Sequence, residues 1–91
     1  METLTRAWAA EFGPAGVRVN AISPGVIRPR AIHGDTHPGV AMMLGTPAGR
    51  SGTPDEVAYA AVYLASDEAR FVHGTVVDVD GGRVAVAVVA S

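Results

Sequence analysis

Two short apolar segments on either side of a strongly marked helix start constrain the fold of this chain more than any other feature. Residues 17–22 and 72–79 are rich in β-branched side chains and are bounded by turn-forming residues, which is typical of strands. Between them, Thr53, Pro54 and Glu56 form the pattern of a capping box with proline at the first helical position. Strand, helix and strand in this order predict a right-handed crossover between parallel strands.

A further helix is expected before the first strand. Its large apolar side chains recur at the spacing of one helical face. Gly13-Pro14 is expected to end it, because glycine suits the left-handed position beyond the last turn and proline cannot continue a helix. The side chains of this apolar face are Met1, Leu4, Trp8 and Phe12.

The connection between the first strand and the capped helix is long and rich in proline and glycine. Residues 24–52 are therefore expected to form a loop with one helical turn at residues 40–44, and loops of this length are usually functional or mobile. After the second strand, Asp80-Gly81-Gly82 indicates a turn. Two alternatives remain for residues 83–91, namely the second strand of a β-hairpin or an apolar tail that docks elsewhere.

Composition excludes several classes of function. The 91 residues suffice for one small domain, and the absence of cysteine excludes disulfides and cysteine-ligated zinc. A net charge of −2 with scattered arginines provides no electrostatic surface for nucleic acid. No apolar run is long enough to span a membrane and no secretory signal is recognisable, so a cytoplasmic location is expected. The chain also contains no lysine.

Two groups of polar side chains suggest chemistry but are better explained otherwise. His33, Asp35 and His37 could ligate a metal, yet ligands two positions apart in a flexible loop rarely preorganise a tetrahedral site. Asp78 and Asp80 fall on the same face of a strand, where solvation at a turn and a sheet edge explains them better than acid–base catalysis. No metal ligand and no catalytic residue is therefore assigned.

The blocks LTRAWAAEFGPAGVRVNAISPGVI and GRSGTPDEVAYAAVYLASDEARFVHGTVVDVDGG carry a family resemblance. On these motifs, residues 3–82 resemble the C-terminal third of a short-chain dehydrogenase/reductase. The resemblance implies an α/β fold, a partial Rossmann-like unit of helix, strand, long loop, helix and strand. It implies a single incomplete segment over residues 1–91, in which residues 28–50 resemble a substrate loop and residues 83–91 form the apolar tail.

The resemblance also implies NAD or NADP as the cofactor. Its cofactor-binding residues would be Pro24, Gly25, Val26 and Ile27, with the backbone around Val26 and Ile27 meeting the nicotinamide carboxamide. Relatives commonly place a threonine two residues after the position of Ile27 to hydrogen-bond the cofactor. This chain has Pro29 there, which offers neither a hydroxyl nor an N–H group.

The family's catalytic groups have no match in this sequence. The resemblance places the Tyr-x-x-x-Lys pair upstream of Met1, and the catalytic serine and the Gly-rich cofactor turn on other segments. Tyr59 and Tyr63 belong to a different block and have no lysine partner. We therefore expect an oxidoreductase segment without activity of its own. The alternative is a non-catalytic, self-associating α/β module or a gene remnant.

Partners follow from the surfaces that such a segment exposes. The strand at residues 17–22 would lack a neighbour on one side, and unpaired strand edges recruit other chains. The resemblance implies pairing through the first helix, so we expect a homo-oligomer, most simply a two-fold dimer. A complementary polypeptide with the N-terminal part of the family's fold is the other candidate partner.

Overall fold

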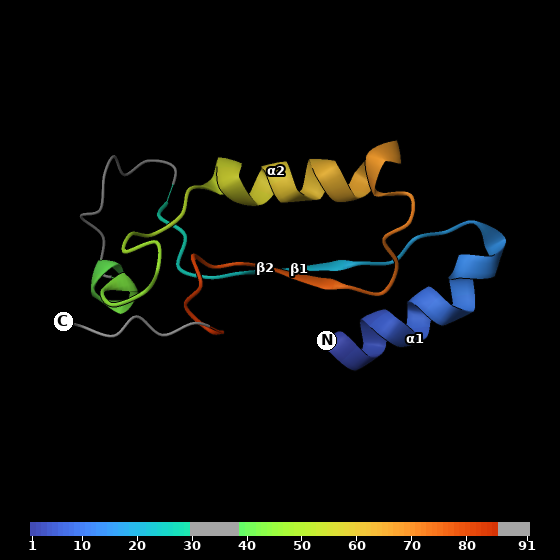
Figure 1. The fold of residues 1–91 in the computed structure, drawn as a ribbon, viewed down its shortest axis with the longest axis horizontal. Coiled ribbons are helices and arrows are strands. Elements are labelled where there is room, and N and C mark those ends of the chain that lie inside the picture. The colour runs from blue at the N-terminus through green and yellow to red at the C-terminus, as the bar shows by residue number, and fades with distance from the viewer. Residues whose placement is uncertain (30–38, 86–91) are drawn as a thin grey trace.

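A computed structural model describes residues 1–29 and 39–85 of the chain (Figure 1). The α/β class expected from the sequence is confirmed. The structure contains two α-helices, two strands and three short 3₁₀ helices: α1 (Glu2–Phe12), η1 (Gly13–Ala15), β1 (Ala21–Pro24), η2 (Val40–Met43), α2 (Pro54–Ala65), η3 (Asp67–Ala69) and β2 (Val76–Val79).

The two strands form the parallel pair that the sequence predicts. Ala21 lies opposite Val76, and Pro24 lies opposite Val79. α2 runs along one face of this pair and contacts both strands (Figure 1). α1 lies at the amino ends of the strands and η2 at their carboxyl ends. The crossover therefore leaves the carboxyl ends of both strands beside the segment that leads into α2.

Both strands are shorter than predicted, because a side chain replaces the first rungs of the ladder. The Asn20 side-chain amide donates to the Val72 carbonyl at 3.0 Å, and its oxygen accepts from the Thr75 N–H at 3.0 Å. Gly74, with φ +74°, bends the chain at the position expected for a bend. Regular pairing can begin only after these residues, so the predicted starts at residues 17 and 72 were wrong.

The predicted end of the first helix was also wrong in detail. Gly13 has φ −55° and continues into η1, so it does not take the left-handed conformation. Pro14 sits in the first turn of η1, where its missing N–H is tolerated. Gly16 takes the left-handed conformation instead, with φ +88°, and its N–H donates to the Gly13 carbonyl at 2.8 Å.

The start of α2 confirms the predicted capping box. The Glu56 N–H donates to Thr53 Oγ1 at 3.2 Å, and the Thr53 N–H donates to Glu56 Oε1 at 2.9 Å. These reciprocal bonds satisfy two amide groups that have no partner within the helix. The helix therefore begins at a fixed point next to the strand ends.

Arg18 closes the other end of α2. Its guanidinium group donates to the carbonyls of Leu64 at 2.6 Å, Ala69 at 3.0 Å and Ser66 at 3.1 Å. Carbonyls at a helix C-terminus have no helical partner and carry partial negative charge. A cation from the segment before β1 therefore ties that strand to the end of α2. Sequence reasoning expected only that Arg18 would be less buried than its neighbours.

The two alternatives for the end of the chain are only partly open to inspection. Residues 81–85 form turns, so a hairpin strand does not start at residue 83. The rest of the tail, residues 86–91, lies outside the described residues, as do His33, Asp35 and His37. The helices within residues 1–29 and 39–85 are all too short or too polar to cross a membrane.

Candidate functional site: the carboxyl ends of the parallel strands

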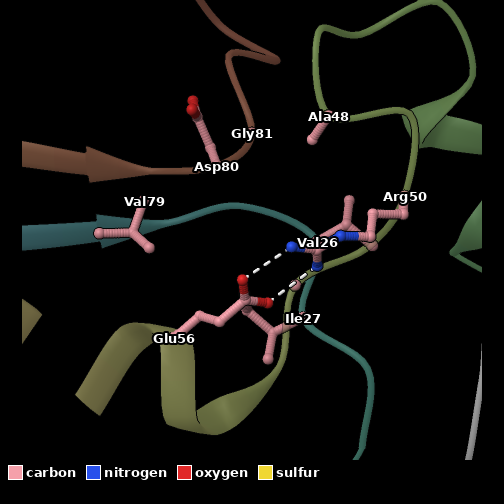
Figure 2. Close-up of a pocket in the computed structure, with 9 residues that line it drawn as sticks. Val26, Ile27, Ala48, Arg50, Glu56, Val79, Asp80 and Gly81 are labelled. Carbon is pink, nitrogen blue, oxygen red and sulfur yellow. Dashed lines mark hydrogen bonds and ion pairs between the residues drawn. The ribbon is translucent and has the colours of Figure 1, made fainter. Parts of the chain in front are cut away.

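The segments that follow β1 and β2 meet at one edge of the sheet. In open parallel α/β sheets, ligands bind outside the carboxyl ends of the strands. A small cavity of about 70 Å³ lies here between these segments and the start of α2 (Figure 2). Ligand pockets typically measure about 300–1,000 Å³. The cavity is therefore a joint between segments, and any larger ligand would lie outside it.

Gly25 makes the closest approach between the two strand ends. Its N–H donates to the Val79 carbonyl at 3.0 Å. A Cβ atom at Gly25 would lie 2.6 Å from Asp80 Cβ and 2.8 Å from Asp80 Cα, inside the limit of real contacts. The chain can therefore turn here only with glycine, which holds the Pro-Gly loop against the end of β2.

Residues 26–28 pair with Gly52 in a short parallel bridge. The Gly52 N–H donates to the Val26 carbonyl at 2.9 Å, and the Arg28 N–H donates to the Gly52 carbonyl at 2.9 Å. In parallel pairing, the residue between two such bonds directs its own N–H and C=O the other way. Neither group of Ile27 has a hydrogen-bond partner among residues 1–29 and 39–85. One donor and one acceptor side by side are complementary to a primary carboxamide.

The segment before α2 is fixed to the end of β2 as well. The Ala48 N–H donates to the Gly81 carbonyl at 3.1 Å. A Cβ atom at Gly81 would lie 2.6 Å from Ala48 Cβ, and one at Gly82 would lie 2.7 Å from Pro47 Cγ. The two glycines after β2 thus allow this segment to pack directly on the turn.

Asp80 is part of that turn. It is buried, and its carboxylate accepts from the N–H groups of Gly82 at 2.9 Å and Val84 at 3.3 Å. Figure 2 shows this carboxylate pointing away from Arg50 and Glu56. The expectation that solvation at the turn explains Asp80 was wrong, because backbone amides bind it, whereas Asp78 is exposed.

An ion pair links the start of α2 to the segment before it. Arg50 Nη1 donates to Glu56 Oε1 at 2.9 Å and Arg50 Nη2 donates to Glu56 Oε2 at 2.8 Å (Figure 2). These bonds, followed by the one from the Thr53 N–H, lower the pKa of Glu56 from 4.5 to about 2. Sequence reasoning identified the capping role of Glu56 but not its pairing with Arg50, which lies six residues away.

The structure brings Pro24, Gly25, Val26 and Ile27 together after β1, at the carboxyl edge of the sheet. Sequence reasoning missed Gly52, although a glycine just before a capping threonine was a signal for close approach. Tyr59 and Tyr63 lie on α2 and are exposed. Within the described ranges, no group of histidine, cysteine, aspartate or glutamate side chains could hold a metal ion.

Comparisons with known proteins agree with one another. A family model described as enoyl-(acyl carrier protein) reductase matches residues 1–83. An uncharacterized oxidoreductase of Schizosaccharomyces pombe is 43% identical over 89 residues, which cover 93% of this chain and 34% of that protein. The 2-(S)-hydroxypropyl-CoM dehydrogenase 3 of Xanthobacter autotrophicus is 41% identical over 90 residues, covering 91% of this chain and 35% of that protein.

Two solved structures share the fold of this chain. A protein described as belonging to the short chain dehydrogenase/reductase family superimposes with a TM-score of 0.77 at 47% identity, over 93% of this chain and 34% of that one. The structure of 4-hydroxyisoleucine dehydrogenase complexed with NADH gives 0.77 at 37% identity, over 93% and 35%. The chain spans about a third of the length of the relatives that it matches.

Proposed function

Because the chain belongs to the short-chain dehydrogenase/reductase family, we propose that it contributes the nicotinamide-facing loop of an NAD(P)-dependent oxidoreductase. The loop consists of Pro24, Gly25, Val26 and Ile27. The observation that carries the proposal is the backbone of Ile27, whose N–H and C=O face away from Gly52 with no partner among the described residues.

The role of these residues is to bind and orient the ring. The C=O of Ile27 can accept from the carboxamide NH₂ group, and its N–H can donate to the carboxamide oxygen. Gly25 lets the loop lie against Asp80 at the carboxyl end of β2, where ligands of such sheets bind. The cofactor, when bound, supplies or accepts the hydride. A related dehydrogenase is complexed with NADH, which supports the choice of nicotinamide.

Proton transfer requires residues from outside this sequence. A tyrosine that exchanges a proton with a carbonyl substrate at neutral pH needs a cation to lower its pKa of about 10. The chain has no lysine, and Tyr59 and Tyr63 lie exposed on α2. We therefore infer that the 91 residues alone do not turn over a substrate. Another polypeptide segment supplies the proton donor and the Gly-rich turn.

Self-association is a second part of the proposal. Leu4, Trp8 and Phe12 lie on one face of α1 and keep 50%, 45% and 41% of their surface exposed. A second copy could cover this apolar face across a two-fold axis. A complementary segment of the same fold could cover it too. A non-catalytic, self-associating module would use the same face, and cofactor binding distinguishes it from the oxidoreductase segment. A cytoplasmic location stays a prediction from sequence.

Titration with NADH, followed at individual backbone amides by NMR, tests the proposal. We expect weak binding, with a Kd on the order of millimolar because only the nicotinamide end is contacted. The largest shift changes should occur at residues 25–27, and NADPH should act similarly. Shift changes confined to other parts of the chain, or none at saturating cofactor, would refute the assigned loop. Tight binding would contradict the view that most of the site lies elsewhere.

A further inference from the structure

The Arg50–Glu56 pair sits where three segments of the chain meet. Glu56 belongs to the first turn of α2 and also accepts from the Thr53 N–H that precedes the helix. Arg50 Nη1 donates both to Glu56 and to the Ser51 carbonyl, the latter at 3.0 Å. Residues 50–53 are thereby held in one conformation by four hydrogen bonds that converge on one carboxylate and one guanidinium group.

The geometry of the pair fixes orientation as well as distance. Two parallel N–H···O bonds between a planar guanidinium and a carboxylate restrict rotation in a way that a single point charge cannot. Ser51, between the two ends of this bonded segment, is almost completely buried at 2% exposure. The direction in which the next residue, Gly52, presents its backbone is therefore set by the pair.

Gly52 transmits this orientation to the loop after β1. Its N–H and C=O form both bonds of the bridge to Val26 and Arg28. A Cβ atom at Gly52 would lie 2.9 Å from Ile27 Cδ1, so the two segments are in close contact there. Ile27, Gly52 and Glu56 line the same small cavity (Figure 2). A change at the pair has a short path to the Ile27 backbone and only a little space to absorb it.

We propose that Arg50 and Glu56 are positioning residues that aim the free N–H and C=O of Ile27 by holding Gly52 in the bridge. What Ile27 meets rests on the function proposed above, but the positioning itself does not. Glu56 thus has two separable roles. Its bond with Thr53 caps α2, and its bonds with Arg50 orient the loop.

Two substitutions separate these roles. Arg50→Gln removes the paired bonds and leaves the capping box of Thr53 and Glu56 complete. Glu56→Gln keeps an oxygen for the Thr53 N–H but turns an NH₂ group toward Arg50. Glu2→Gln is the matched control, because it removes one negative charge and the exposed ion pair that Glu2 forms with Arg6 at 3.2 Å. Arg50→Lys keeps the charge without the two parallel bonds.

Hydrogen exchange of the full chain, measured by NMR, gives the readout. The amides of Gly52 and Arg28 report on the bridge, and those of Ala21 and Gly25 report on the ladder between β1 and β2. We expect R50Q and E56Q to exchange about three- to tenfold faster at the bridge, with the ladder unchanged, because an exposed pair contributes modestly to local stability. R50K should fall between wild type and R50Q, and E2Q should match wild type.

Each outcome bears on the positioning role. Unchanged exchange at Gly52 and Arg28 in R50Q, or equal acceleration at the bridge and the ladder in both R50K and R50Q, would overturn it. If NADH fails to perturb residues 25–27 of the wild-type chain, the proposed function fails while the exchange result stands. If NADH binds there, R50Q should weaken that binding several-fold and E2Q should not.

Discussion

Gly25 is the residue on which the shape of the site depends most directly. The backbone of Asp80 occupies the space where a side chain at this position would begin. Asp80 cannot easily move, because its carboxylate is bonded to the amides of Gly82 and Val84. Steric pressure at Gly25 must therefore displace the loop that carries Val26 and Ile27.

We predict that Gly25→Ala destabilises the chain by about 1–3 kcal/mol, as expected for overpacking against backbone atoms. Urea unfolding measures the change in the free energy of unfolding. The matched control is Gly13→Ala, because a Cβ atom there would meet only His73 Nδ1, at 3.8 Å, and φ is −55°. Equal unfolding midpoints for the two variants would show that the close approach to Asp80 has no energetic consequence.

At the scale of elements, α2 is fixed at both ends by residues that precede or follow it in the chain. The capping box and Arg50 hold its first turn, and Arg18 binds its last carbonyls together with the carbonyl at the end of η3. β1 is thereby connected to both ends of the helix that covers it. The orientation of α2 on the sheet depends on hydrogen bonds at its ends as well as on side-chain packing.

We predict that Arg18→Met lowers the free energy of unfolding by about 1–3 kcal/mol, because three carbonyls lose a charged donor. Arg18→Lys should recover part of this loss. Chemical denaturation measures both variants. Arg6→Met is the control, since it removes an arginine from an exposed i,i+4 pair that contributes little. A loss no larger for R18M than for R6M would contradict the role of Arg18.

The first turn of α2 also predicts a dependence on acid. Glu56 has a pKa of about 2 in the folded chain against an ordinary value of 4.5. A lowered pKa stabilises the folded state at pH values above about 4.5, and this contribution is lost as the pH falls from there toward 2. Both side chains remain exposed, 55% for Arg50 and 39% for Glu56, so solvent screens the contribution to about 1 kcal/mol or less.

Comparison of wild type with E56Q across pH measures this contribution. The difference in the free energy of unfolding should be full at pH 6 and approach zero near pH 2, and added salt should reduce it at the higher pH. A difference that stays constant over this range would show that protonation of Glu56 is not involved.

Sequence reasoning succeeded where the signal was local. The capping box, the bend at Gly74, the turn at η2 and the parallel crossover each depend on neighbouring residues or on element order. It failed where a residue acts across the chain. Arg18 binds carbonyls 46 to 51 positions away, and Asn20 ends the ladder through Val72 and Thr75. Which polar side chain replaces a ladder bond is decided by tertiary packing, which local propensity does not encode.

For the whole molecule, the notable property is how little of its apolar surface is buried. Among the described residues, only Ala9, Met43 and Ala69 are buried apolar side chains. Small chains bury a small fraction of their surface and are correspondingly marginal in stability. The exposed face of α1 is the largest reserve of apolar area near one terminus, and covering it would stabilise the chain.

We predict self-association through α1. Leu4→Glu should shift the chain toward a smaller species in sedimentation velocity at low micromolar concentration, because a charge would be placed at the apolar interface. Val62→Glu is the control, since Val62 is equally large and exposed but lies on α2. A compact, folded monomer of the wild-type chain under these conditions would contradict the prediction.

Hydride transfer by the purified chain tests the central claim most directly, which is that these residues hold and orient a nicotinamide while the proton donor comes from elsewhere. The assay follows NADH and NADPH absorbance with a panel of carbonyl compounds. We predict no consumption that scales with the concentration of the chain. Turnover proportional to that concentration, in material free of host reductases, would contradict the account.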